Sequence, residues 1–338
     1  MTGVDTRNEL REFLTTANRA VGLSRFGSPE VLGVVSVPVA APGPLDALVR
    51  VRAAAVNPSD TLLRTGRQAE RLGGISPPFI PGMDLAGDIV ALGNAVAGTG
   101  LHVGQAVAGV VRPWRPNGGA QARYVVVPAS SLVPIPGNMS YAEAATILMN
   151  ALTALVAMEL LDLKPGSRLL VTGGAGAFGG YAVSLARHQG HFVIADGRES
   201  DRELLLRLGA QLVVPRGEAM AAAVREAAPG GVDGLVDAAR LGEPATPLVR
   251  DGGTFINARS TASPGNDGRI RREAVFVPDH FDRTDKIREA MDLARIGVLV
   301  PRVALQLPME QAAEAHRLLE RGGLRGRIVL TFDHQPLA

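Results

Sequence analysis

The sequence predicts an α/β protein of two domains, in which a β-rich part is followed by a doubly wound parallel sheet. Its 338 residues are more than one simple hydrophobic core usually holds. Residues 20–137 consist mainly of short apolar runs separated by Gly- and Pro-rich turns, with little helical spacing. From residue 138 onward, apolar strands alternate with helical patterns, and this alternation is typical of a parallel sheet with helical crossovers.

The elements follow from the pattern in chain order. Apolar runs of the first part, such as ALVRVRAAAV and AGDIVALG, favour an antiparallel barrel or sandwich. The second part begins with a long Ala/Leu-rich helix, where Ser140 and Glu143 have the spacing of a capping box. Five strands separated mostly by helices come next: RLLVTGG, HFVIAD, QLVVP, GVDGLVDAA and GGTFINA. After residue 280 the pattern is helix, strand, helix and strand.

A glycine-rich turn, VTGGAGAFGG at residues 171–180, joins the first of these strands to a helix. A tight turn, close approach to a diphosphate and close helix–strand packing each favour a residue without a Cβ. The amides at the start of the helix can then hold the pyrophosphate. The turn therefore predicts a Rossmann-type dinucleotide site. Its candidate cofactor-binding residues are Gly173, Gly174, Ala175, Gly176, Ala177, Phe178 and Gly179.

The coenzyme is chosen at the end of the second strand, in HFVIADGRESDR. An acid there binds the ribose diol of NAD, and a basic side chain accommodates the 2′-phosphate of NADP. Asp196 favours NAD, although Gly197 suits the position of the acid equally well. Arg198 and Arg202 favour NADP, unless they only begin a solvated helix. We predict NADPH, with NADH as the alternative. The carboxyl ends of the fourth and fifth predicted strands add further candidate cofactor contacts. These are Asp237, Ala238, Phe255, Ile256 and Asn257.

Composition excludes several classes of protein. The sequence has no cysteine, which rules out disulfides, thiolate metal sites and a cysteine nucleophile, and fits a cytoplasmic location. The net charge is +2, aromatic content is 4%, and no dense basic run occurs, so we expect no nucleic-acid partner. We see no apolar run of about 18 residues and no apolar signal-peptide core, so we expect neither a membrane span nor export. The expected partner is a small-molecule substrate.

The order of these parts resembles the medium-chain dehydrogenase/reductase superfamily, and above all its zinc-independent quinone oxidoreductase branch, which is related to zeta-crystallin. The resemblance covers about residues 20–332. The segments that carry it are RFGSPEVL at 25–32, AAVNPSDTLLRTG at 54–66, PFIPGMDLAGDIVALG at 78–93, GGAQARYVVVPA at 118–129, AATILMNALTAL at 144–155, VTGGAGAFGG at 171–180 and GRIVL at 326–330.

The resemblance implies three parts of the chain. An N-terminal extension would cover residues 1–19, and a GroES-like catalytic domain would combine residues 20–137 with residues 281–338. A Rossmann dinucleotide-binding domain would cover residues 138–280. The resemblance also implies a homodimer.

The resemblance also implies which residues form the site. Zinc-dependent members hold the metal with cysteine and histidine, and the matching positions are Asn57, Met83 and Met149, which are poor zinc ligands, so we expect no zinc. Asn57 would face the nicotinamide, its ribose or the substrate, or else be a turn residue before a proline. Ser59 would match a hydroxyl that relays protons, or else cap a turn. Thr153 would reach the nicotinamide with its hydroxyl.

These residues predict hydride transfer from NADPH to a quinone or to the C=C bond of an α,β-unsaturated carbonyl. Without a metal this addition is easier than alcohol oxidation, because the negative charge delocalises onto oxygen. A pathway-specific enoyl or ketone reductase and a non-catalytic NADPH-binding protein are the alternatives. Some enoyl-thioester reductases of this superfamily use a tyrosine near the NPSD segment. No tyrosine lies there in this sequence, which counts against a thioester substrate and makes solvent a candidate proton donor. Trp114 and Arg115 belong either to an edge of the substrate cleft or to a surface turn.

Overall fold

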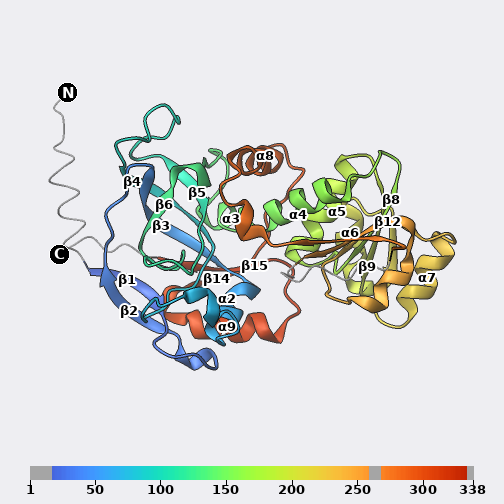
Figure 1. Cartoon of the computed structure of the whole chain (residues 1–338), viewed down its shortest axis with the longest axis horizontal. Coiled ribbons are helices and arrows are strands. Elements are labelled where there is room, and N and C mark those ends of the chain that lie inside the picture. The colour runs from blue at the N-terminus through green and yellow to red at the C-terminus, as the bar shows by residue number, and fades with distance from the viewer. Residues whose placement is uncertain (1–16, 259–267, 333–338) are drawn as a thin grey trace. The chain divides into compact units, whose positions relative to one another are not determined.

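The structure is a computed structural model that describes residues 17–258 and 268–332 (Figure 1). The chain divides into two compact units. Unit 1 comprises Met1–Met149, Phe281–Met291 and Pro301–Ala338. Unit 2 comprises Asn150–His280 and Asp292–Val300. The β-rich part and the parallel-sheet part expected from the sequence are therefore separate bodies, and the predicted fold class is confirmed.

Unit 1 is built on a seven-stranded sheet in the order β14-β15-β3-β4-β5-β7, with β6 pairing to β3. Its strand pairs are antiparallel except β14 with β15, which is parallel. Two further strands, β1 and β2, form a small antiparallel sheet. The strands are β1 (Ala17–Gly22), β2 (Gly33–Pro38), β3 (Asp46–Val56), β4 (Asp84–Leu92), β5 (Ala106–Val110), β6 (Tyr124–Pro128), β7 (Leu132–Pro134), β14 (Val303–Pro308) and β15 (Arg327–Thr331).

Two helices of unit 1 are joined by an ion pair between a buried arginine and an exposed glutamate. Helix α2 (Pro58–Arg64) follows β3, and helix α9 (Ala312–Arg321) precedes β15. The α9 sequence AAEAHRLLER buries Ala312, Ala315 and His316 and leaves its charged positions more exposed, as an amphipathic helix does. Arg64, only 2% exposed, pairs with Glu320 across the two helices. This ion pair fixes α2, which carries several of the candidate site residues.

Unit 2 is a six-stranded parallel sheet in the order β10-β9-β8-β11-β12-β13. This is the doubly wound order in which the chain starts at the centre and reverses direction after three strands. Figure 1 shows helices of this unit flanking the sheet. The strands are β8 (Arg168–Thr172), β9 (Phe192–Gly197), β10 (Leu212–Pro215), β11 (Val232–Asp237), β12 (Val249–Ala258) and β13 (Arg271–Val275). The remaining α-helices are α3 (Tyr141–Ala144), α4 (Leu148–Leu161), α5 (Ala177–His188), α6 (Arg202–Leu208), α7 (Ala219–Ala227) and α8 (Thr284–Arg295).

The sixth strand, β13, was missing from the sequence prediction. Its residues RREAV are mostly half-exposed because β13 lies at the edge of the sheet. An edge strand buries fewer apolar side chains than a central one, so its pattern is weak. The five strands predicted from apolar runs correspond to β8 to β12.

The boundary between the units lies after Met149, whereas the sequence predicted it after residue 137. Two contacts hold the intervening segment in unit 1: the Tyr141 hydroxyl bonds Asp88, and the Met149 N–H donates to Asp84 at 2.7 Å. Unit 1 resumes at Phe281, and Asp292–Val300 packs with unit 2. Residues 1–16 of the expected extension lie outside the described residues.

One helical segment, Tyr141–Leu161, is long and apolar enough to cross a membrane, with a mean hydropathy of 1.8. The expectation that the chain has no such apolar stretch is therefore wrong at this segment. The most apolar stretch of 18 residues in this segment is 78% buried inside the protein, as in the core helix of a globular protein. Within the described residues it is the one helix that passes this test, and it is weak evidence for a membrane span.

Candidate active site

The glycine-rich turn lies between β8 and α5, at the carboxyl edge of the parallel sheet. Gly173 has a φ of +65°, which L side chains rarely adopt. A Cβ on Gly179 would lie 2.3 Å from the carbonyl oxygen of Gly173, so helix α5 packs directly on the turn. Gly176 is the N-cap of α5, whose first amides carry the positive end of the helix dipole. The structure thus supplies physical reasons for glycine at these positions.

A network of hydrogen bonds centred on Asp237 lies beside the glycine-rich turn. The Asp237 carboxylate, at the end of β11, accepts hydrogen bonds from the Thr172 hydroxyl at 2.7 Å and from the backbone N–H of Leu241 and Gly242 at 3.0 and 2.8 Å. The Thr172 oxygen in turn accepts the N–H of Ala239 at 3.0 Å. Asp237 is only 1% exposed, so its carboxylate shapes the loop after β11.

Asp196 also turns into the protein. Its side chain is 3% exposed, and its Oδ1 accepts the backbone N–H of Gly173. Its Oδ2 pairs with Arg216 Nε at 3.3 Å. Burial raises the pKa of Asp196, while the Gly173 N–H and the Arg216 charge favour the ionised form. Both carboxylate oxygens of the residue that favoured NAD are therefore engaged within the protein.

Position 197 is closed to an acidic side chain. A Cβ on Gly197 would lie 2.4 Å from Leu205 Cδ1, and Leu205 is fully buried. Arg198, Arg202 and Arg216 are all exposed at the same edge of the sheet. Arg216 directly follows β10, whose Pro215 pairs with Gly197. This edge thus combines exposed guanidinium groups with an internally engaged carboxylate.

The predicted residues at the end of β12 differ in access. Phe255 and Ile256 are 3% and 0% exposed, so their side chains belong to the core and only their backbone is near the edge. Asn257 is half-buried at the carboxyl end of the strand. Ala238, after β11, is half-buried too.

Unit 1 contains a buried polar cluster of four side chains, Asn57, Asp60, Asp84 and Gln121, which we call the Asn57 cluster. Asn57 is the N-cap residue of α2. Its Nδ2 donates to Asp84 Oδ2 at 2.8 Å, and the other Asp84 oxygen accepts the Met149 N–H. Because Asp84 accepts on both oxygens, it fixes which way the Asn57 amide faces. Asn57 Oδ1 is left buried with no hydrogen-bond partner among the described residues.

Asp60 is the second carboxylate of the cluster. Its Oδ2 accepts the Asn57 N–H at 2.8 Å and Gln121 Nε2 at 3.2 Å, and its Oδ1 accepts the Gly82 N–H at 3.1 Å. Burial raises the pKa of Asp60 to about 7, with a further upward contribution from the charge of Asp84. Burial likewise raises the pKa of Asp84 to about 6. The cluster therefore titrates near neutral pH.

The two predicted hydroxyls lie in different units. Ser59, on α2 of unit 1, is half-buried, and its hydroxyl donates to Met83 Sδ at 3.6 Å. A thioether is a weak acceptor, so this hydroxyl is easily redirected to a ligand. Thr153 lies on α4 in unit 2 and is 9% exposed.

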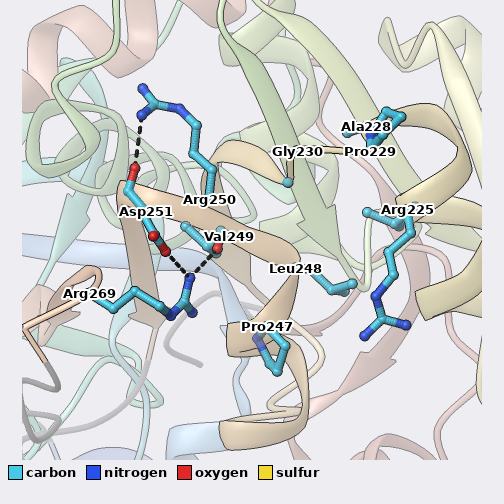
Figure 2. A pocket seen from close by; sticks show the side chains of 12 residues that line it. Arg225, Ala228, Pro229, Gly230, Pro247, Leu248, Val249, Arg250, Asp251 and Arg269 are labelled. Carbon is cyan, nitrogen blue, oxygen red and sulfur yellow. Dashed lines mark hydrogen bonds and ion pairs between the residues drawn. The ribbon is translucent and has the colours of Figure 1, made fainter.

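A separate hollow of about 480 Å³ lies at the opposite, amino edge of the unit 2 sheet (Figure 2). Figure 2 shows Arg225, Arg250 and Arg269 around it. Arg250 pairs with Asp233 at 2.6 Å, and Arg269 pairs with Asp251 at 3.2 Å. Two of its three arginines are thus neutralised within the protein, and the hollow is far in the fold from the glycine turn.

Known proteins place this geometry in a family. Residues 43–137 match the alcohol dehydrogenase GroES-like domain, and residues 208–330 match the zinc-binding dehydrogenase domain. The chain belongs to the medium-chain dehydrogenase/reductase superfamily. The superfamily resemblance stated from the sequence segments is confirmed.

The relatives differ in their named activities. The chain is 28% identical to a 2-methylene-furan-3-one reductase from Solanum lycopersicum, over 92% of this chain and 78% of the relative. It is 28% identical to a quinone oxidoreductase from Pongo abelii, over 92% and 97%. It is 27% identical to an NAD-dependent alcohol dehydrogenase from Sulfolobus acidocaldarius, over 92% and 99%. A mycobacterial protein solved with NADPH is similar with a TM-score of 0.80 at 26% identity, over 93% of this chain and 100% of that one.

Zinc, which the name of the matched dehydrogenase domain suggests, does not fit the residues present. The Asn57 side chain and the Met149 backbone N–H both contact Asp84, and Met83 precedes it in the chain; the three side chains are an amide and two thioethers. Zn²⁺ prefers thiolate, imidazole and carboxylate ligands. Within residues 17–258 and 268–332, no group of three His, Cys, Asp or Glu side chains could hold a metal ion.

A nicotinamide dinucleotide does fit the superfamily turn of unit 2. Gly173, Gly174, Gly176 and Gly179 carry no Cβ, so the backbone at the start of α5 can approach a diphosphate closely. Gly173, Asp196, Gly197 and Asp237 lie at this edge, whereas Asn57 and Ser59 lie in unit 1.

Sequence reasoning missed four residues of this machinery. Arg216 follows the strand QLVVP, and the doubly wound order places that strand beside β9, which is a usable signal. Asp60 belongs to the NPSD segment, but it was not among the candidate site residues. Asp84 and Gln121 had no signal, because each reaches the cluster from a distant segment of the chain.

Proposed function

We propose that this protein is a zinc-independent, NADPH-dependent reductase of quinones or of α,β-unsaturated carbonyl compounds. The observation that carries the proposal is the donor set Asn57, Met83 and Met149, which suits hydride transfer without a metal. Two relatives, named as a quinone oxidoreductase and a 2-methylene-furan-3-one reductase, support this class of acceptor.

The charges at the end of β9 support NADPH. A ribose diol needs a free carboxylate, but Asp196 is engaged by Gly173 and Arg216. The exposed guanidinium groups of Arg198, Arg202 and Arg216 are suited to a 2′-phosphate. A solved structure neighbour in complex with NADPH agrees with this choice.

A bound nicotinamide would supply the hydride for the β-carbon of an enone, and the α-carbon would need one proton in addition. The chain's own groups serve the charge and the proton. The Ser59 hydroxyl, held only by a thioether, can donate to the carbonyl oxygen on which negative charge builds up. Asn57, oriented by Asp84, offers its buried Oδ1 to a ligand donor. With a pKa of about 7, about half of the Asp60 carboxyl groups carry a proton at neutral pH.

The activity is tested by following NADPH oxidation with 1,4-benzoquinone, cyclohexenone and crotonyl thioester, and NADP⁺ reduction with ethanol. We expect turnover with the quinone or the enone and none with the alcohol, with rates unchanged by EDTA or added zinc. Turnover limited to the thioester would favour the pathway-specific enoyl reductase. Tight NADPH binding without turnover of any acceptor would favour the non-catalytic protein.

The coenzyme is tested with Arg216→Ala. This change removes a cation and frees one oxygen of Asp196, so the ratio of NADPH to NADH affinity should fall at least about tenfold. Arg198→Ala should lower the same ratio. Arg225→Ala, at the opposite edge of the sheet, is the matched control and should leave it unchanged. A ratio that ignores both Arg216→Ala and Arg198→Ala would refute the NADPH assignment.

A further inference from the structure

A cavity in unit 1 is lined by residues outside the Asn57 cluster. It holds about 300 Å³, the lower end of the size range for small-molecule sites. Its walls come from β1, β2, β6, the segment after η2 (Ala69–Leu72) and the loop at residues 112–119. Neither Asn57, Ser59 nor Met83 is among its lining residues. The apolar part of the wall is formed by Leu72, Ile75, Phe79, Ile80, Pro113 and Val126.

The wall is held by backbone hydrogen bonds. The Gly119 N–H donates to the Ile80 carbonyl at 2.8 Å, and the Ala120 N–H donates to the Gly82 carbonyl at 2.9 Å. A Cβ on Gly118 would lie 2.6 Å from Ile80 Cβ, so the loop packs tightly on this segment. Arg71 also stacks on the ring of Trp114 at 5.2 Å. These contacts hold in place the segments that line the cavity.

Arg115 is the charged residue of this cavity. Its Nε donates to the Gly118 carbonyl at 2.8 Å, which explains its position in the loop but uses one of its five N–H donors. Its Nη2 is buried with no hydrogen-bond partner among the described residues. Burial lowers the pKa of Arg115 to about 10, partly offset by the charge of Asp46, and the guanidinium stays charged at neutral pH.

No acidic side chain is among the described residues that line the cavity. Asp46 has a favourable charge interaction with Arg115, but it makes no ion pair with Arg115 in the described part of the chain. Tyr124, on the same wall, lies in the field of Arg50, Arg52 and Arg123. Burying a guanidinium charge among apolar side chains costs free energy unless an anion pairs with it.

We propose that this cavity binds a small apolar monocarboxylate, whose carboxylate pairs with the Arg115 guanidinium and whose hydrocarbon body fills the apolar walls. Because Nε already donates to the Gly118 carbonyl, the carboxylate would pair with the two Nη groups, in an end-on, two-bond geometry. A phosphate dianion would need more cationic donors than Arg115 provides. The site is independent of the hydride chemistry, since it shares no residue with the Asn57 cluster or the glycine turn.

The sequence supplies a built-in probe, because Trp114 is its only tryptophan and adjoins Arg115. The experiment titrates the full-length protein, saturated with NADPH, with cyclohexanecarboxylate while tryptophan emission is recorded. We expect a saturable change with a Kd on the order of 1 mM or below. The neutral isostere cyclohexanecarboxamide should bind at least about tenfold more weakly, because it cannot neutralise the guanidinium.

Variants separate this site from any other. Arg115→Gln should weaken cyclohexanecarboxylate at least about tenfold, and Arg115→Lys should weaken it less, because lysine keeps the charge but loses the fork. Arg112→Gln, on the same loop but outside the lining, is the matched control and should bind normally. If Arg115→Gln does not fold, Ser76→Glu places a carboxylate at the wall and should block binding, with Ser76→Gln as its control.

Three results would overturn the proposal. These are no saturable signal with cyclohexanecarboxylate, equal affinity for the carboxamide, or an affinity that both Arg115→Gln and Ser76→Glu leave unchanged. Enone reduction is measured in parallel. A titration that disappears with Arg115→Gln while reduction persists supports the cavity, whereas loss of reduction alone bears only on the proposed reductase activity.

Discussion

The glycine turn of unit 2 and the Asn57 cluster of unit 1 are built in opposite ways. The turn is made of backbone, and its geometry depends on the contact between Gly173 and Gly179, six residues apart in one continuous segment. The Asn57 cluster is made of side chains, and Asp84 and Gln121 reach it from 27 and 61 residues away along the chain. The glycine turn is thus a rigid backbone site, and the Asn57 cluster is a hydrogen-bonded network of titratable side chains.

This difference predicts how each site fails. A side chain added to the glycine turn would displace the backbone by steric overlap, and a change of pH would not restore coenzyme binding. A network of buried carboxylates fails electrostatically, because each lost partner strands a buried polar group. The substitutions below test that contrast, beginning with the largest expected effect.

The largest effect is expected for Gly179→Ala. The new Cβ would lie 2.3 Å from the Gly173 carbonyl oxygen, so helix α5 must move away from the turn. NADPH affinity should fall at least about a hundredfold, and stability should fall by about 1–3 kcal/mol, as for an overpacked core. Isothermal titration and urea unfolding measure the two effects. Gly230→Ala, which meets nothing within 4 Å, is the control, and an equal loss in both variants would contradict the steric argument.

The next effect is expected for Asp84→Ala. The change strands the Asn57 Nδ2 group and the Met149 N–H, which both donate to this carboxylate. We expect a loss of about 3 kcal/mol in unfolding free energy, while NADPH binding to unit 2 is largely kept. Asp285→Ala removes an exposed carboxylate of the same unit and should cost little. Unchanged stability in Asp84→Ala would mean that the cluster is not a structural network.

The smallest and most specific effect is a pH slope that Asp60→Asn removes. Asp60 ionises at its ordinary pKa of 3.8 when unfolded and at about 7 when folded. Between these values the folded state binds more protons, so stability falls as pH rises from about 4 to about 7 and levels off above. Asp84 adds the same sign up to about pH 6. Melting temperatures measured from pH 5 to 8 should fall more steeply in the wild type than in Asp60→Asn; parallel curves would refute the raised pKa.

The sequence by itself determined the parallel sheet, its central strands and the glycine turn. Each depends on residues that are neighbours in the chain, such as apolar runs of one strand or glycines three apart. The edge strand β13 was not predicted from the sequence, because few of its side chains are buried and its apolar pattern is weak. The long apolar helix Tyr141–Leu161 was missed as a span-length stretch, and only its 78% burial shows a core helix.

The tertiary structure alone decided how the candidate polar residues are used. Asp196 has the position of a ribose-binding acid in the sequence, but the folded chain gives both its oxygens to Gly173 and Arg216. Nothing in the sequence indicates that Asp60 and Asp84 are buried together, and it is this burial that raises their pKa values towards neutrality. The reason is physical: backbone conformation is set by local residue types, whereas the charge state of a side chain is set by whatever the fold packs around it.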